Sequence, residues 1–107
     1  MIEVCAVGGY SEVGKNMTAV KIDDDAVIFD MGLHLDSYID YTQDEDMVKI
    51  NTDELRKVGA IPDDTVIEKW KGNVKAIVIS HAHLDHVGAL VFMAGKYKDA
   101  PIYCTPY

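Results

Sequence analysis

The chain has 107 residues, enough for one small domain with a single hydrophobic core. Ten basic and eighteen acidic residues give a formal net charge of -8, which opposes general binding to phosphate backbones, so a nucleic-acid role requires a local site, a metal ion or further sequence. No apolar run approaches the roughly 20 residues of a membrane helix, and the first residues lack the basic start and apolar core of a signal peptide. These features predict a cytoplasmic protein with no membrane partner.

The amino-terminal part of the chain predicts three strands. Apolar and polar residues alternate over Ile2–Val7 and Met17–Ile22, and Ala26–Phe29 is a short apolar run that ends at Asp30. Glycine-rich and aspartate-rich segments separate the three runs and are turn signals. Met17–Asp30 therefore predicts a β-hairpin.

The middle of the chain has a weaker pattern. A short helix is expected with Thr52 or Asp53 as its N-cap and with Leu55 and Val58 facing inward. Residues 65–71 predict a further turn of helix.

The carboxyl-terminal part contains the clearest buried strand. Val74–Ser80 is a near-continuous apolar run, as expected for a strand covered on both faces. A helix packed on the sheet is predicted over His86–Tyr97, and Pro101–Cys104 begins a last strand. Four apolar residues fall at helical spacing in the predicted helix: Val87, Leu90, Val91 and Ala94. The order of elements predicts an α/β domain.

Three histidines and an aspartate directly follow the buried strand, in the segment HAHLDH at residues 81–86. His81 and His83 are two residues apart, so in an extended backbone both imidazoles point to the same side and can face one metal ion. Asp85 and His86 lie where the chain turns into the helix and can reach a second ion. These donors suit Zn²⁺, and also Mn²⁺ or Fe²⁺. The alternative is a polar loop satisfied by hydrogen bonds, but the carboxyl end of a strand is where open α/β sheets place ligands.

The segment HAHLDH resembles the H-x-H-x-D-H signature of metallo-β-lactamase-fold hydrolases, and Asp30 resembles that family's earlier motif aspartate. GGYSEVGKNM at residues 8–17 resembles the opening of the β-CASP branch, which processes RNA or DNA, and residues 76–90 are similar to the ribonuclease J family. The resemblance covers most of the chain except about residues 34–72. It implies the amino-terminal half of an αββα sandwich, a mixed sheet with helices on one face.

The resemblance also implies roles for the motif residues. His81 and His83 would bind the first metal ion, and Asp85 and His86 the second, with two zinc ions, or manganese, hydrolysing a phosphodiester bond of RNA. Asp85 is the candidate catalytic residue because it would also take part in proton transfer. Asp30 would support the metal loop without binding metal.

Three further residues have two interpretations each. Ser11 and Asn16 are candidates for the substrate edge of the active site, and a role in the turn is the alternative. His34 is interpreted as a loop histidine, with metal ligation as the alternative.

The family's remaining ligands and its inserted β-CASP domain would lie beyond residue 107. Residues 1–107 are therefore interpreted as a partial metallo-β-lactamase domain, inactive alone, from a parent that binds RNA. Its exposed apolar sheet face and strand edge would drive self-association. Two alternatives stay open, namely a hydrolase of a thioester, lactone or lactam on the same fold, and a non-enzymatic half-domain that binds metal or a partner. The sequence leaves open whether the ribonuclease is an exonuclease or an endonuclease.

Overall fold

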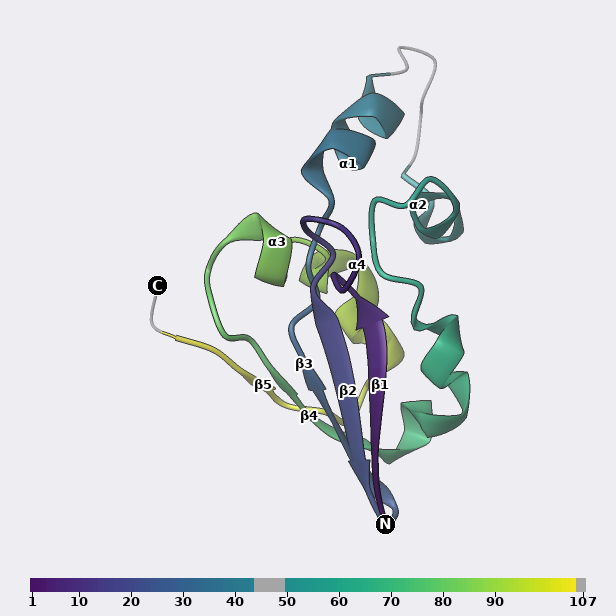
Figure 1. The fold of residues 1–107 in the computed structure, drawn as a ribbon, viewed down its shortest axis with the longest axis vertical. Coiled ribbons are helices and arrows are strands. Elements are labelled where there is room, and N and C mark those ends of the chain that lie inside the picture. The colour runs from purple at the N-terminus through teal and green to yellow at the C-terminus, as the bar shows by residue number, and fades with distance from the viewer. Residues whose placement is uncertain (44–49, 106–107) are drawn as a thin grey trace.

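A five-stranded mixed sheet forms the centre of the computed structural model, which describes residues 1–43 and 50–105 (Figure 1). The strand order follows the chain, and the two pairings among the first three strands are antiparallel whereas the next two are parallel. The strands are β1 (Ile2–Gly8), β2 (Met17–Ile22), β3 (Asp25–Phe29), β4 (Val74–Val78) and β5 (Ile102–Tyr103). The predicted α/β class, mixed sheet and β-hairpin are confirmed.

Short helical segments occupy the connections between the strands. They are α1 (Leu35–Thr42), α2 (Thr52–Lys57), the 3₁₀ segment η1 (Asp64–Asn73), α3 (Leu84–Val87), α4 (Leu90–Met93) and the 3₁₀ turn η2 (Ala94–Lys96). In Figure 1, α4 passes behind the strands, and α1 and α2 lie beyond the upper end of the sheet. No helix among the described residues has the length and apolar character needed to cross a membrane.

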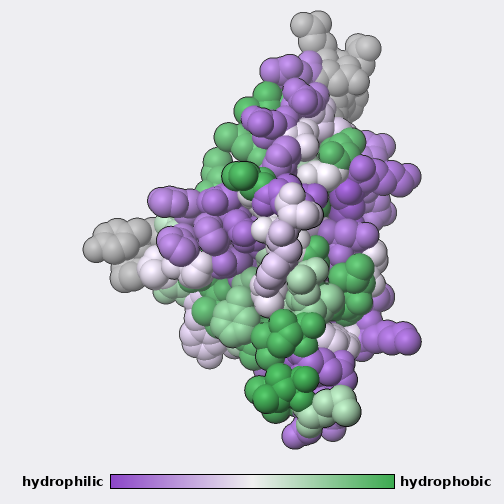
Figure 2. All heavy atoms as spheres, viewed as in Figure 1, coloured by the Kyte–Doolittle hydropathy of each residue, from purple (hydrophilic) through white to green (hydrophobic). Residues whose placement is uncertain are grey.

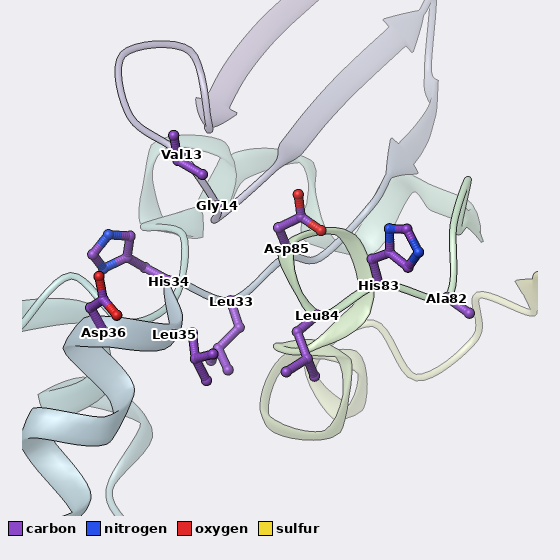
Figure 3. A pocket seen from close by; sticks show the side chains of 10 residues that line it. All are labelled: Val13, Gly14, Leu33, His34, Leu35, Asp36, Ala82, His83, Leu84 and Asp85. Atoms are coloured by element: carbon purple, nitrogen blue, oxygen red, sulfur yellow. The ribbon is translucent and has the colours of Figure 1, made fainter.

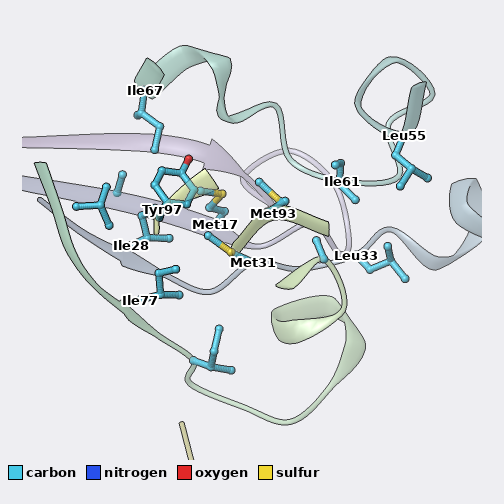
Figure 4. Close-up of a cluster of buried hydrophobic side chains, with 14 of the residues drawn as sticks. Met17, Ile28, Met31, Leu33, Leu55, Ile61, Ile67, Ile77, Met93 and Tyr97 are labelled. Atoms are coloured by element: carbon cyan, nitrogen blue, oxygen red, sulfur yellow. The ribbon is translucent and has the colours of Figure 1, made fainter. Parts of the chain in front are cut away.

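The core lies on the face of the sheet turned toward α4. Ala19, Ile28 and Ile77 are neighbours across β2, β3 and β4, and all three are fully buried. Met93 and Tyr97 are also buried in this cluster (Figure 4). Because burial of apolar surface is the main favourable term in folding, this cluster explains why the short elements hold together.

The opposite face of the sheet remains open. Its neighbouring strands present Ile2, Val4, Ile22 and Phe29, which are 67%, 66%, 53% and 44% exposed. In Figure 2 apolar surface gathers over the lower half of the molecule, where β1, β2 and β3 lie. We call this surface, made of these four residues together with the less exposed Val20 and Val27, the open sheet face.

The predicted continuous helix over His86–Tyr97 is wrong, because tertiary hydrogen bonds divide it into α3, α4 and η2. The backbone N–H of Met31 donates to the carbonyl of His86 at 2.9 Å, and the N–H of Ala89 donates to the carbonyl of Met31 at 2.9 Å. Because these backbone groups bond to Met31, they do not form the hydrogen bonds of a continuous helix. Val91, predicted to face inward, is consequently 84% exposed.

The middle of the chain also differs in detail from the prediction. Helix α2 begins at Thr52, but its N-cap is Asn51, whose side-chain oxygen accepts from two backbone N–H groups of the first turn. Leu55 is buried as predicted, whereas Val58, the C-cap residue, is 47% exposed and does not face inward as predicted. Helix α1 was not predicted, and His34 is its N-cap.

Candidate metal centre

The HAHLDH motif joins the end of β4 to helix α3. His83 has an extended backbone, with φ -86° and ψ 149°, and is the N-cap of α3, while Asp85 and His86 lie within that helix. The motif therefore has the predicted local structure, an extended approach followed by a helical turn. This arrangement places two histidines before the helix and the other two candidate ligands on it.

The structure brings the four candidate ligands close together. The ring centroid of His81 lies 4.5 Å from that of His86 and 5.9 Å from that of His83. Oδ2 of Asp85 lies 3.6 Å from Nε2 of His86. Within residues 1–43 and 50–105, however, no three His, Cys, Asp or Glu side chains are close enough to a common point to hold a metal ion. The donors are thus gathered in one place without a closed ligand set.

Asp30 and Ser80 fix the orientation of two of these imidazoles. Asp30 is 9% exposed, and its carboxylate accepts from the backbone N–H of Ser80 at 2.7 Å and from Nδ1 of His86 at 2.8 Å. The hydroxyl of Ser80 donates its only proton to Asp30, at 2.8 Å from Oδ2, so its oxygen can accept from Nδ1 of His81 at 2.8 Å. In both histidines Nδ1 is thereby occupied, and Nε2 is the ring nitrogen left to face a metal ion.

This hydrogen bonding fits metal ligation. A metal-binding histidine commonly donates its other ring nitrogen to a carboxylate or a similar acceptor, which fixes the tautomer and the ring orientation. Two of the three motif imidazoles have such a partner here. The contribution of Ser80 was missed from the sequence, although a polar residue between an apolar strand and His81 is a signal that could have identified it.

Asn16 and Gly32 lie against the backbone of the motif, at the carbonyl of Asp85. The carbonyl of Asp85 accepts from the backbone N–H of Asn16 at 3.1 Å and from its side-chain Nδ2 at 2.8 Å. A side chain on Gly32 would collide with the same carbonyl, so a glycine is needed at this close approach. The structure therefore places Asn16 against the motif backbone, and a contact of Asn16 with substrate stays a prediction.

Among the described residues, Ser11 makes a local hydrogen bond and none to the four candidate ligands. It is exposed, and its hydroxyl donates to Oε2 of Glu12 at 2.8 Å. This bond, followed by that from the N–H of Gly9, lowers the pKa of Glu12. The predicted place of Ser11 at the substrate edge remains a prediction.

His34 caps α1 by accepting from the N–H of Ser37 at 3.3 Å, which is the loop role expected of it.

We expect Asn16→Asp to loosen the motif. The substitution removes the Nδ2 donor and sets a carboxylate against a carbonyl oxygen, so the free energy of unfolding should fall by about 1–3 kcal/mol and zinc should bind more weakly. Urea denaturation and a zinc competition titration measure the two effects. Ser11→Ala is the control, with an expected change within about 0.5 kcal/mol because both Ser11 and its partner Glu12 are exposed. Equal stability and zinc affinity in Asn16→Asp and wild type would contradict the role assigned to Asn16.

A pocket of about 610 Å³ opens beside the motif. Residues 13–14, 33–36 and 82–85 line it, so three segments that are distant in sequence meet there. In Figure 3, His83 and Asp85 stand on one side of it, with His34 and Asp36 on the other. The motif thus forms one wall of a concave surface, as a reactive centre requires.

The mixed sheet and the histidine–aspartate cluster at the end of β4 define an α/β domain of the kind that carries a metal-dependent hydrolytic centre. Residues 10–107 match the Metallo-beta-lactamase superfamily, and the chain belongs to that family. Membership implies the use of divalent metal ions.

Comparison with individual proteins shows which members of that family the chain resembles. The chain is 50% identical over 106 residues to Ribonuclease J of Methanocaldococcus jannaschii and 50% identical over 107 residues to Ribonuclease J of Pyrococcus abyssi. It is 34% identical over 107 residues to Transcription termination factor FttA of Thermococcus kodakarensis. These alignments cover 99%, 100% and 98% of this chain, but 23%, 23% and 14% of the relatives. The resemblance to ribonuclease J expected from the motifs is confirmed, and the chain spans less than a quarter of the length of these relatives.

Proposed function

We propose that residues 1–107 form the amino-terminal part of a cytoplasmic, metal-dependent ribonuclease. The observation that carries this proposal is the cluster of His81, His83, Asp85 and His86, held by Asp30 and Ser80, in a chain half identical to two proteins named Ribonuclease J. The rest of the metallo-β-lactamase domain and a β-CASP domain would complete the protein. RNA is the substrate that fits these relatives' names.

In this proposal the four candidate ligands divide between two metal ions. His81 and His83 bind one ion, and Asp85 and His86 bind the other, with Zn²⁺ favoured by the nitrogen donors and Mn²⁺ as the alternative. Four protein donors cannot complete four-coordination at two zinc ions. Water or residues outside this set would supply the remaining ligands.

The chemistry proposed for the site is hydrolysis of a phosphodiester bond. Bound divalent cations supply a water of lowered pKa and stabilise negative charge on the phosphoryl group. Asp30 and Ser80 keep Nε2 of His81 and His86 free by occupying their Nδ1 atoms. The Asp85 carboxylate is 43% exposed, so it is accessible to accept a proton during the reaction.

Cleavage of a 5′-monophosphorylated RNA by the whole protein tests this function. We expect cleavage with Zn²⁺ or Mn²⁺, loss of cleavage with a chelator, and no cleavage by residues 1–107 alone. The product lengths distinguish an exonuclease, which releases mononucleotides, from an endonuclease. Hydrolysis of a thioester, lactone or lactam without RNA cleavage would instead support the alternative hypothesis of a different hydrolase on the same fold. Metal binding without any of these activities would support a non-enzymatic role.

We also propose that residues 1–107, when isolated, self-associate through the open sheet face. This face presents apolar side chains on three neighbouring strands, and β1 is an edge strand of the sheet that the described residues form. Apolar contacts are not directional, and a second copy offers the same surface, so a symmetric interface can form without any other partner.

A charge placed on the open sheet face should separate the copies. Val4→Glu, on β1, is expected to convert a dimer at micromolar concentration into a monomer, because the dimer would bury that carboxylate without a partner. Light scattering measures the change. Val66→Glu is the matched control, since Val66 is 61% exposed on η1, outside that face. A wild-type chain that is monomeric at these concentrations would refute self-association.

A further inference from the structure

The pocket beside the HAHLDH motif has an apolar lining that the metal chemistry does not use. Val13, Leu35 and Leu84 line it from three different segments, and these side chains are 85%, 44% and 52% exposed. Large exposed apolar side chains that surround a hollow are typical of a ligand site. The volume of about 610 Å³ lies within the range of pockets that take a ligand of nucleotide size.

Without bound metal, the charged groups that line the pocket disfavour a phosphate. Asp36 and Asp85 are among its lining residues, and the described lining residues include no Lys or Arg. In the metal-free chain an anion would therefore meet two carboxylates, with no Lys or Arg among the described lining residues to offset them. An uncharged ligand with N–H donors suits the pocket instead, because a carboxylate accepts hydrogen bonds from the amino groups of nucleobases.

His34 adds an aromatic ring to the pocket lining, on the side opposite the motif. Its Nδ1 lies 2.7 Å from the hydroxyl of Ser37 and accepts from the Ser37 backbone N–H at 3.3 Å, so the orientation of the ring is fixed. Single-stranded RNA is commonly recognised by stacking of unpaired bases on aromatic side chains, including histidine. Figure 3 shows His34 and Asp36 on the same side of the pocket, opposite the motif residues.

We propose that this pocket binds one nucleobase of the RNA strand next to the metal centre. The base packs on Val13, Leu35 and Leu84 and stacks on His34, with an amino group donating to Asp36. Because Asp85 belongs both to the pocket and to the motif, a base held here brings its own sugar-phosphate toward the candidate ligands. This proposal rests on the proposed ribonuclease function and adds a binding site for the base.

A titration of residues 1–107 with cytidine, followed by amide chemical shifts in the absence of metal, tests the site. We expect shifts at residues 13–14, 33–36 and 82–85, and none with ribose 5-phosphate. Asp36→Ala and Leu35→Ala should each weaken cytidine binding about tenfold, as the loss of one charge-assisted hydrogen bond or one apolar contact implies. The matched controls are Asp40→Ala and Ile39→Ala, since both residues are exposed on α1 outside the pocket.

Three outcomes would overturn the base site. They are no shifts with cytidine, equal shifts with ribose 5-phosphate, or wild-type affinity in both pocket variants. The exposure of Leu35 and Asp36 makes unfolding of these variants unexpected, and well-dispersed spectra verify this. Because the titration needs neither metal nor cleavage, its failure leaves the ribonuclease proposal to be judged by metal content and RNA cleavage.

Discussion

Replacing His81 and His83 together with alanine is expected to lower the zinc affinity of the chain by at least about a hundredfold. Changes to residues that merely support a metal ligand already cost 10- to about 100-fold in affinity, and this double variant removes two imidazole donors. A zinc competition titration and the metal content of the purified protein measure the loss. His34→Ala is the matched control, because His34 caps α1 and is not among the proposed ligands.

Variants of the supporting residues should give a smaller, graded effect. Ser80→Ala removes the acceptor for Nδ1 of His81, and Asp30→Asn removes the carboxylate that receives Nδ1 of His86. We expect each to weaken zinc binding by about 10- to 100-fold.

Equal metal content in wild type and the His81→Ala, His83→Ala double variant would show that the motif is not the metal site.

Replacing Asp64 with alanine is expected to lower the free energy of unfolding by about 3–5 kcal/mol. Asp64 is fully buried, and its carboxylate accepts from Nε of Arg56 at 2.9 Å and from the hydroxyl of Tyr97 at 2.7 Å. Nζ of Lys96 lies 3.5 Å from the same carboxylate. Removal of the carboxylate leaves the buried Tyr97 hydroxyl without this acceptor, and it leaves the mostly buried guanidinium of Arg56 paired with the exposed Asp53 alone. Urea denaturation followed by circular dichroism measures the loss.

The size of this effect follows from the position of Asp64 between elements. It begins η1, while Arg56 belongs to α2 and Tyr97 is the C-cap of η2, so one carboxylate joins three segments. Burial and the hydrogen bond to Asp64 raise the pKa of Tyr97, which keeps its hydroxyl protonated as a donor.

Glu68→Gln provides the matched control for Asp64→Ala. Glu68 pairs with Lys96 and Lys71, but its side chain is 47% exposed, and surface ion pairs contribute at most about 1 kcal/mol. A loss for Asp64→Ala no larger than that for Glu68→Gln would show that the buried network does not hold these segments together.

Local sequence patterns predicted the strands because their information is local. Alternation over Met17–Ile22 and the aspartate turn before Asp25 specify the hairpin, and Asp23 takes the positive φ of 52° that such a turn requires. The helix predicted over His86–Tyr97 failed for the opposite reason. Its backbone groups bond to residue 31, which lies more than fifty positions earlier in the chain, and no periodicity within the segment shows this.

The candidate metal centre also depends partly on local sequence and partly on contacts that are distant in sequence. The sequence alone determined which donors lie together, since His81, His83, Asp85 and His86 fall within six residues and the local backbone gathers them. Only the tertiary structure decided how they are held. Asp30 reaches Ser80 across 50 positions and Asn16 reaches Asp85 across 69. The physical reason is that orientation of a side chain depends on hydrogen-bond partners brought near by folding, and a linear pattern carries no record of those partners.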